Sequence, residues 1–285
     1  CLFGFCLLAQ RPVQKKVTAT PATQKKDTVV KAGKPASKEE PKQKSKVYLL
    51  HSDILKKTLD RSDVQVVVGN VIFRHDSVYM YCDSAYYFDQ RNSFEAFGNV
   101  RMEQGDTLFL YGDHLYYDGM TQIAQMRMNV RLENRNTTLL TDSLNYDRVY
   151  SLGYFFDGGT LMDEQNVLTS EWGEYNTQNK QSVFNYNVKL VNPQFTLTSD
   201  TLRYNTASKV ANIVGPSDIL SDNNHIYSES GYYNTQTGKA DLYQRSVLTN
   251  DGKQLTGDTL FYDRNEGVGE AFHDMVMTDT VNKNM

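Results

Sequence analysis

Residues Thr107–Asp118 read T-L-F-L-Y-G-D-H-L-Y-Y-D, and variants of this phrase recur along the chain at an almost constant interval. Steps of 30, 29, 29, 29, 29 and 29 residues separate the acids of successive copies, which are Asp83, Asp113, Asp142, Glu171, Asp200, Glu229 and Asp258. A fixed period of this length is typical of a repeat architecture. Because the acid recurs at one place in every copy, we interpret this column as structural.

Two further columns accompany the acids. A tyrosine stands four residues after each acid, from Tyr87 to Tyr262. An aliphatic residue stands three residues before each acid, and these are Met80, Leu110, Leu139, Leu168, Leu197, Ile226 and Leu255. An atypical eighth copy around Asp53 has a lysine in place of the tyrosine, which predicts an end cap over residues 47–75.

The second half of each repeat contains the triplet G-N-V or a variant of it, as at Gly98-Asn99-Val100. Apolar residues two positions apart and short polar turn clusters predict strands with one buried face. No sustained helical period occurs in residues 47–285. The sequence therefore predicts a single all-β domain over 47–285, built from about eight repeats of 29 residues.

The apolar columns within one copy are out of phase for a flat strand. The aliphatic column lies on one face, whereas the tyrosine and the residue two before it lie on the other, because successive side chains alternate. The residue two before the tyrosine, which we call the second apolar position, is leucine in four copies, at Leu115, Leu144, Leu202 and Leu260. One extra residue beside the acid, a bulge or corner at the small residue that precedes it, would bring both sets to one interior.

The first 46 residues differ from the rest. Residues 1–10 are uncharged, apolar and too short to span a bilayer, and we interpret them as the residual end of a signal peptide, with a truncated membrane anchor as the alternative. Residues 11–46 hold ten lysines and four of the six prolines, with a net charge of +8 in a chain of −4. They are predicted to be a disordered linker, either a soluble spacer or a segment attracted to anionic lipid headgroups.

The chain carries no recognisable catalytic motif. Its five histidines share no metal-ligand spacing, and after residue 10 the only cysteine is Cys82, which argues against a disulfide framework and a cysteine-rich metal site. The remainder of the chain beyond the linker has a net charge of −12, from −4 minus +8, which argues against a nucleic-acid partner. We therefore expect a non-enzyme without metal or cofactor.

The phrases D-T-L-x-x-D-x-L-x-Y and G-N-V resemble the OstA-like family, which includes the periplasmic lipopolysaccharide-transport protein LptA and the N-terminal domain of LptD. Asp106-Thr107-Leu108, Asp113-His114-Leu115-Tyr116-Tyr117 and Gly98-Asn99-Val100 carry the resemblance, with their copies over 47–285. The Ala-Gln end of the apolar segment and the lysine-rich spacer resemble the Bacteroidetes type. The chain is longer than most LptA-like proteins, so it is either an LptA equivalent or part of a larger protein.

The resemblance implies an open β-jellyroll of stacked antiparallel strands in the periplasm. Its apolar interior would shelter the acyl chains of lipopolysaccharide (lipid A), and its ends would pair with transport components at the inner and outer membranes or with further copies, head to tail. The residues expected to contact lipid are Met80, Leu110, Leu115, Leu139, Leu144, Leu168, Leu197, Leu202, Ile226, Leu255 and Leu260.

Two other functions are open on the sequence alone. One is an exported parallel β-solenoid that acts on or binds polysaccharide. The other is a purely structural envelope repeat protein with a solidly packed interior. The second apolar position shrinks to Ala85, Gly173 and Gly231 in three copies, and such small residues would leave room for a ligand, which favours the lipid conduit.

Overall fold

The computed structural model describes residues 45–57 and 63–279, so the predicted signal-peptide remnant and nearly all of the predicted linker lie outside the described residues. The described residues belong to a compact unit that spans 43–285. They form twenty strands in one sheet and a single 3-10 turn, η1 (Asp89–Arg91). The prediction of an all-β domain is confirmed.

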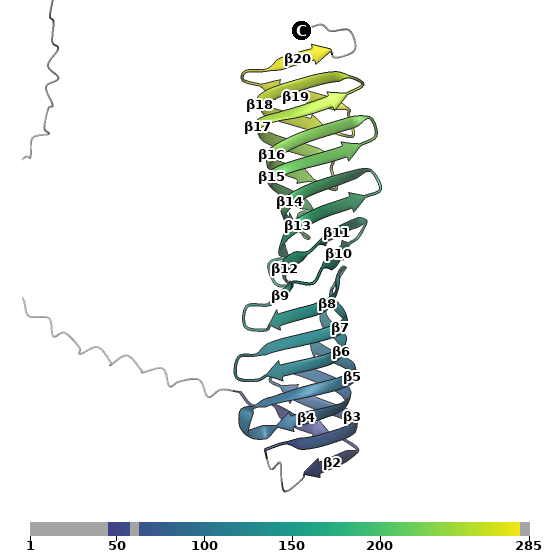
Figure 1. Cartoon of the computed structure of the whole chain (residues 1–285), viewed down its shortest axis with the longest axis vertical. Helices are drawn as coiled ribbons and strands as arrows, with labels where there is room; N and C mark the ends of the chain where they lie inside the picture. Colours follow the sequence, from purple (N-terminus) through teal and green to yellow (C-terminus); the bar gives the residue numbers. More distant parts are fainter. Residues whose placement is uncertain (1–44, 58–62, 280–285) are drawn as a thin grey trace, which may run out of the picture. The chain divides into compact units, whose positions relative to one another are not determined.

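Long strands of eleven or twelve residues make up most of the sheet. They are β3 (Gln65–His75), β4 (Val78–Phe88), β5 (Ser93–Gln104), β6 (Leu108–Asp118), β7 (Ile123–Asn134), β8 (Thr137–Asp147), β13 (Gln181–Asn192), β14 (Phe195–Asn205), β15 (Val210–Ser221), β16 (Asn224–Asn234), β17 (Lys239–Asn250) and β18 (Lys253–Asp263). Figure 1 shows them stacked in chain order.

The short strands are halves of interrupted long ones, because both members of each pair are hydrogen-bonded to the same neighbour. β1 (Tyr48–His51) and β2 (Ile54–Lys57) pair with β3, and β9 (Leu152–Phe155) and β10 (Gly159–Asp163) pair with β8. β11 (Asn166–Ser170) and β12 (Trp172–Asn176) pair with β13, and β19 (Val268–Phe272) and β20 (Val276–Asp279) pair with β18.

Every strand pairing among the described residues is antiparallel, and each long strand pairs with the strands before and after it in the chain, counting the two short strands of an interrupted strand as one. The stacked antiparallel strands of the predicted jellyroll are thus confirmed, and a parallel β-solenoid does not describe this sheet. Aspartate or asparagine after the column tyrosine makes the hairpin turns, because its side-chain oxygen accepts from the backbone two residues on. Examples are Asp118 with Met120 N–H at 2.7 Å and Asn205 with Ala207 N–H at 2.9 Å.

The extra residue lies in the G-N-V strands and not, as expected from the sequence, beside the acid. Between β5 and β6 the register passes from Phe97↔His114 to Val100↔Gly112, so β5 advances by three residues where β6 advances by two. Gly98 and Asn99 occupy the bulge with φ of 74° and 46°, the left-handed region that glycine and asparagine tolerate. The G-N pair is therefore a β-bulge signal.

The bulges fold each strand so that its two halves face one another. On β6 the buried residues are Leu108, Leu110 and Gly112 before the acid, and Leu115 and Tyr117 after it, so the side of burial changes at the acid as predicted. Rings from opposite halves of the sheet consequently meet in the core. Phe73 and Phe94 stack with centroids 4.1 Å apart, and Phe195 and Tyr233 lie at 4.7 Å.

Candidate functional site

The interior between the two strand halves is lined by the residues expected from the sequence to contact lipid. Ten of those eleven side chains are buried at 0–1% exposure, and Leu255 is half-buried and packs against the same cluster. The aliphatic column and the second apolar position belong to one continuous core, because the bulge places both on the inner face. Sequence periodicity thus locates the lining of the interior.

The interior is filled by its own side chains. The small residues Gly173 and Gly231, expected to leave room for a ligand, leave none in this structure. A Cβ on Gly173 would lie 2.6 Å from the ring of Phe155, and one on Gly231 would lie 2.4 Å from the carbonyl oxygen of Asp241. The ring of Phe155 and the backbone of the strand paired with Gly231 occupy the volume beside these glycines, as expected for close-packed protein interiors.

The recurring acids bind the bulge of the preceding or following strand. The side-chain amide of Asn99 donates to Asp83 at 2.8 Å, and that of Asn129 donates to Asp113 at 2.6 Å. Asn187 donates to Glu171 in the same way at 2.5 Å. This asparagine partner of the acid column was not identified from the sequence, although its fixed position in the G-N-V triplet carried the signal.

The column tyrosines reach the line where the two halves of the fold meet. Here the turns that follow the tyrosines approach the turns at the other strand ends. The first set of turns is at 88–93, 118–123, 147–152, 176–181, 205–210, 234–239 and 263–268. The second set is at 75–78, 104–108, 134–137, 163–166 and 192–195. We call the first set the tyrosine-side turns, the second the opposite turns, and the line between them the seam. Within the described residues, side chains and not backbone–backbone hydrogen bonds cross it.

Clusters of hydrogen-bonded side chains connect the two sides of the seam, and we call each cluster a clasp. One clasp surrounds the buried His75. Its Nδ1 lies 2.6 Å from the hydroxyl of Tyr117, and Arg148 reaches both groups, at 3.1 Å and 2.5 Å. Burial and then the nearby Arg148 charge lower the pKa of His75, and the more distant Asp76 opposes this. A neutral imidazole with Nδ1 as acceptor from Tyr117 or Arg148 fits this arrangement.

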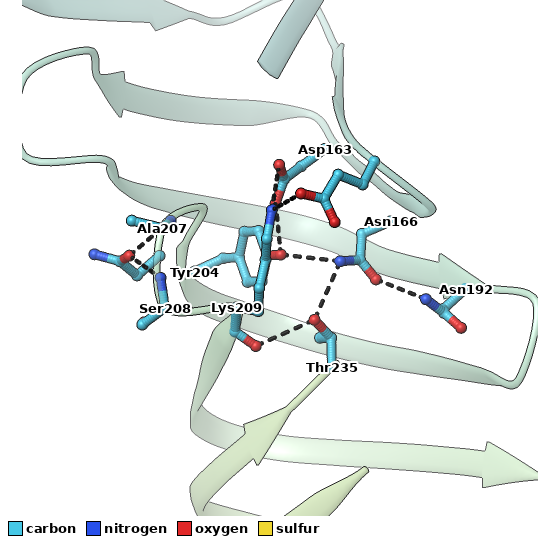
Figure 2. A network of polar contacts seen from close by, with 10 residues as sticks. Asp163, Asn166, Asn192, Tyr204, Ala207, Ser208, Lys209 and Thr235 are labelled. Atoms are coloured by element: carbon cyan, nitrogen blue, oxygen red, sulfur yellow. Dashed lines mark hydrogen bonds and ion pairs between the residues drawn. The ribbon is translucent and has the colours of Figure 1, made fainter. Parts of the chain in front are cut away.

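A second clasp is centred on Asp163, in the opposite turn between β10 and β11 (Figure 2). Its carboxylate is 1% exposed, accepts from the Tyr204 hydroxyl at 2.8 Å and forms an ion pair with Lys209 Nζ at 2.8 Å. Asn166 donates to Tyr204 at 3.0 Å and to Thr235 at 3.1 Å. Both charges and their neighbours are therefore satisfied, as a buried pair requires.

Burial raises the pKa of Tyr204, and so does the charge of Asp163 beside it. Burial lowers the pKa of Lys209, but its bonds to Asp163 and Glu164 outweigh this and leave the pKa raised. The network thus favours a charged lysine and a neutral tyrosine at neutral pH. The contacts of this clasp across the seam join residues 38 to 69 positions apart, and they were not identified from the sequence.

Within residues 45–57 and 63–279, no group of three or more histidine, cysteine or acidic side chains is placed to hold a metal ion. The same residues include no helix that is long and apolar enough to cross a membrane. The buried Cys82 packs in the core, where burial raises the pKa of its thiol to about 12.

Comparison with known proteins identifies one sequence family. The family described as OstA-like protein matches residues 44–200 and 196–258. Among solved structures, the chain is similar to LptH of Pseudomonas aeruginosa, described as the LptA homologous periplasmic component of the conserved lipopolysaccharide transport device. The identity is 15% and the TM-score 0.38, over 41% of this chain and 96% of LptH. No curated protein matches the chain.

Proposed function

This chain belongs to the OstA-like family, and from that premise we propose that it binds lipopolysaccharide in the periplasm and carries it between the membranes. The acyl chains of lipid A would occupy the space between the two strand halves. The observation that carries the proposal is the continuous apolar lining, which extends from Met80 through Leu139 and Leu197 to Leu260 without a buried charge in those columns.

Lipid enters such an interior only if the two halves separate, and the seam is suited to this. The strand ladders hold each half together through backbone hydrogen bonds, whereas the seam has side-chain contacts. Separation of the halves therefore leaves every ladder intact. Acyl chains then replace the lost contacts, with about 0.8 kcal/mol for each buried methylene. No catalytic group is needed, and we propose a non-enzymatic role without cofactor.

The ends of the sheet are candidates for partners. β20 and the short β1 and β2 lie last in the sheet at either end of the described residues, and strands in such places can add a strand from another chain. We propose that inner- and outer-membrane transport components, or further copies of the chain, pair there. The lysine-rich segment and the apolar start are proposed as spacer and export signal.

A second candidate function is a purely structural envelope repeat protein. The closed packing of the interior, with Phe155 against Gly173, favours it. In that function the core stabilises a rod of repeats and never opens. The two candidates differ in one observable, which is whether lipid reaches the interior residues of the folded protein.

The test is photo-crosslinking in a lipopolysaccharide-producing bacterium. A benzoyl-phenylalanine probe is placed at Leu197 or at the half-buried Leu255, both on the inner face. Matched controls at the exposed Thr198 and Arg203 report on the outer face of one of the same strands, β14. Circular dichroism of each purified variant establishes that it is folded.

Lipopolysaccharide adducts at the inner positions and not at the outer ones are expected. Exported, folded protein without adducts at either inner position would refute transport and leave the structural role as the explanation. Adducts at all four positions in equal yield would also contradict a lipid path through the interior.

A further inference from the structure

A cleft of about 520 Å³ lies on the seam next to the Asp163 clasp. It is lined by two opposite turns, that of Arg135 between β7 and β8 and that of Asp163 and Glu164 between β10 and β11. Two tyrosine-side turns complete the lining, that of Lys180 between β12 and β13 and that of Lys209 between β14 and β15. The cleft therefore bridges the two halves of the fold.

The charges around this cleft do not balance. Lys209 is neutralised by Asp163 and by Glu164, whose carboxylate lies 3.2 Å away. Lys180 has no acidic partner among the described residues, and its ammonium donates to the carbonyl of Thr177 at 2.9 Å. Arg135 likewise forms no ion pair with a described residue. Both side chains line the cleft, and burial, then the like charge of Arg135, lower the pKa of Lys180.

The cleft continues toward the interior. An adjoining cleft of about 310 Å³ shares Thr107, Asn134, Thr177 and Gln178 with it and is also lined by Leu108 and Tyr146 of the buried core. The amide oxygen of Gln104 in this second cleft is buried and has no hydrogen-bond partner in the described part of the chain. When the halves separate, this acceptor would become available to a hydroxyl or amide N–H of a ligand.

We propose that Arg135 and Lys180 bind the phosphate of an amphiphile's headgroup at the seam, while its acyl chains pass inward between the halves. A phosphate between these two side chains would satisfy both cations, and guanidinium and ammonium groups are strong donors to it. The proposal rests on the proposed function for its acyl chains. It adds the chemistry of the headgroup, which the interior does not specify.

The test measures the binding of two lipids to the purified chain in detergent micelles. One is lipid A with its phosphates, and the other is the same lipid after enzymatic removal of the phosphates. The double variant Arg135→Gln/Lys180→Gln is compared with Lys189→Gln/Arg203→Gln, which makes the same charge change at exposed positions of β13 and β14. Inorganic phosphate alone is titrated against the unaltered chain.

We expect the unaltered chain to bind the phosphorylated lipid at least about tenfold more tightly, since charge-assisted hydrogen bonds of this kind are strong enough for that. The cleft variant should lose this preference, and the control variant should keep it. Equal affinity of the unaltered chain for both lipids would overturn the proposal and leave lipid transport standing. Binding of neither lipid would reject both.

Two further outcomes would also overturn the proposal. One is a preference for phosphate that survives in the cleft variant, because the selective groups would then lie elsewhere. The other is an affinity for inorganic phosphate equal to that for the phosphorylated lipid, because the site would then serve a free anion and not a headgroup.

Discussion

Replacing Asp163 by asparagine removes one charge from the buried clasp of Figure 2 and leaves Lys209 with a single, exposed partner. Breaking a buried ion pair from one side costs about 3–5 kcal/mol, because the remaining charge stays desolvated. Asparagine can still accept from Tyr204, and Glu164 still lies 3.2 Å from Lys209. We therefore expect the lower end of this range, about 3 kcal/mol.

The assay is urea unfolding followed by the fluorescence of Trp172. It is the single tryptophan of the chain, and it lies on β12, close to the clasp in the sequence. This local reporter is needed because a repeat array can unfold in sections. Glu164→Gln is the control, since its carboxylate is 55% exposed and an exposed pair contributes at most about 1 kcal/mol.

A double variant separates the ion pair from the packing around it. Asp163→Leu/Lys209→Met removes both charges, and such replacements are often neutral, so we expect a loss well below that of Asp163→Asn. A loss of less than 1 kcal/mol in Asp163→Asn would refute the reasoning, because the pair would then be too hydrated to hold the seam. Equal losses in the single and double variants would refute it too.

Three further predictions concern the bulge, the core and the first clasp. Gly98→Ala should cost about 1 kcal/mol more than Gly105→Ala in urea unfolding, because both have positive φ but only the Cβ at Gly98 would meet a carboxylate oxygen, at 2.5 Å; equal costs would contradict the packed bulge. Cys82, whose pKa burial raises to about 12, should react with iodoacetamide at pH 8 only after denaturation, in a chain whose other two cysteines are serine; rapid labelling of folded protein would contradict this. Because burial and then Arg148 lower the pKa of His75, the unfolded chain binds the extra proton, and stability should fall as the pH drops below about 6.5. His75→Gln should remove this component of the pH dependence, and an unchanged profile would assign it to other groups.

Much of the fold follows from the repeated phrase, because repetition averages out local exceptions. Leu110 and Leu115 lie on opposite faces of a flat strand, and this conflict predicted a change in the side of burial within the strand. The predicted position of the extra residue was wrong, because a single phrase does not say which of two paired strands carries that residue. The left-handed Gly98-Asn99 pair decides that question, because those residue types tolerate positive φ.

The seam could not be predicted in the same way. Its contacts join the column tyrosines Tyr117, Tyr175 and Tyr204 to residues that lie eight positions before an acid of the column. These partners differ in type from repeat to repeat, and they are His75, Asn134 and Asp163. The contacts depend on how far one half of the sheet is displaced against the other, which is set by bulges and twist along the whole array and not by any one repeat. Periodicity in residue type therefore reports the apolar interior, and it does not reveal the seam partners, whose residue types change from repeat to repeat.

This division between an apolar interior and a polar seam bears on how lipid binding would be linked to stability. Opening the seam breaks clasps such as His75–Tyr117–Arg148 and exposes apolar lining, at about 25 cal/mol for each Å². A ligand recovers that cost only by covering the same lining with apolar chains and by compensating the exposed polar groups at the seam. An amphiphile with acyl chains and an anionic headgroup does both, because the unbalanced cations lie on the seam and the leucine columns lie behind it. A purely apolar molecule would cover the lining but would not compensate the polar groups at the seam. The proposed acyl-chain path and the proposed headgroup site therefore support the same ligand class.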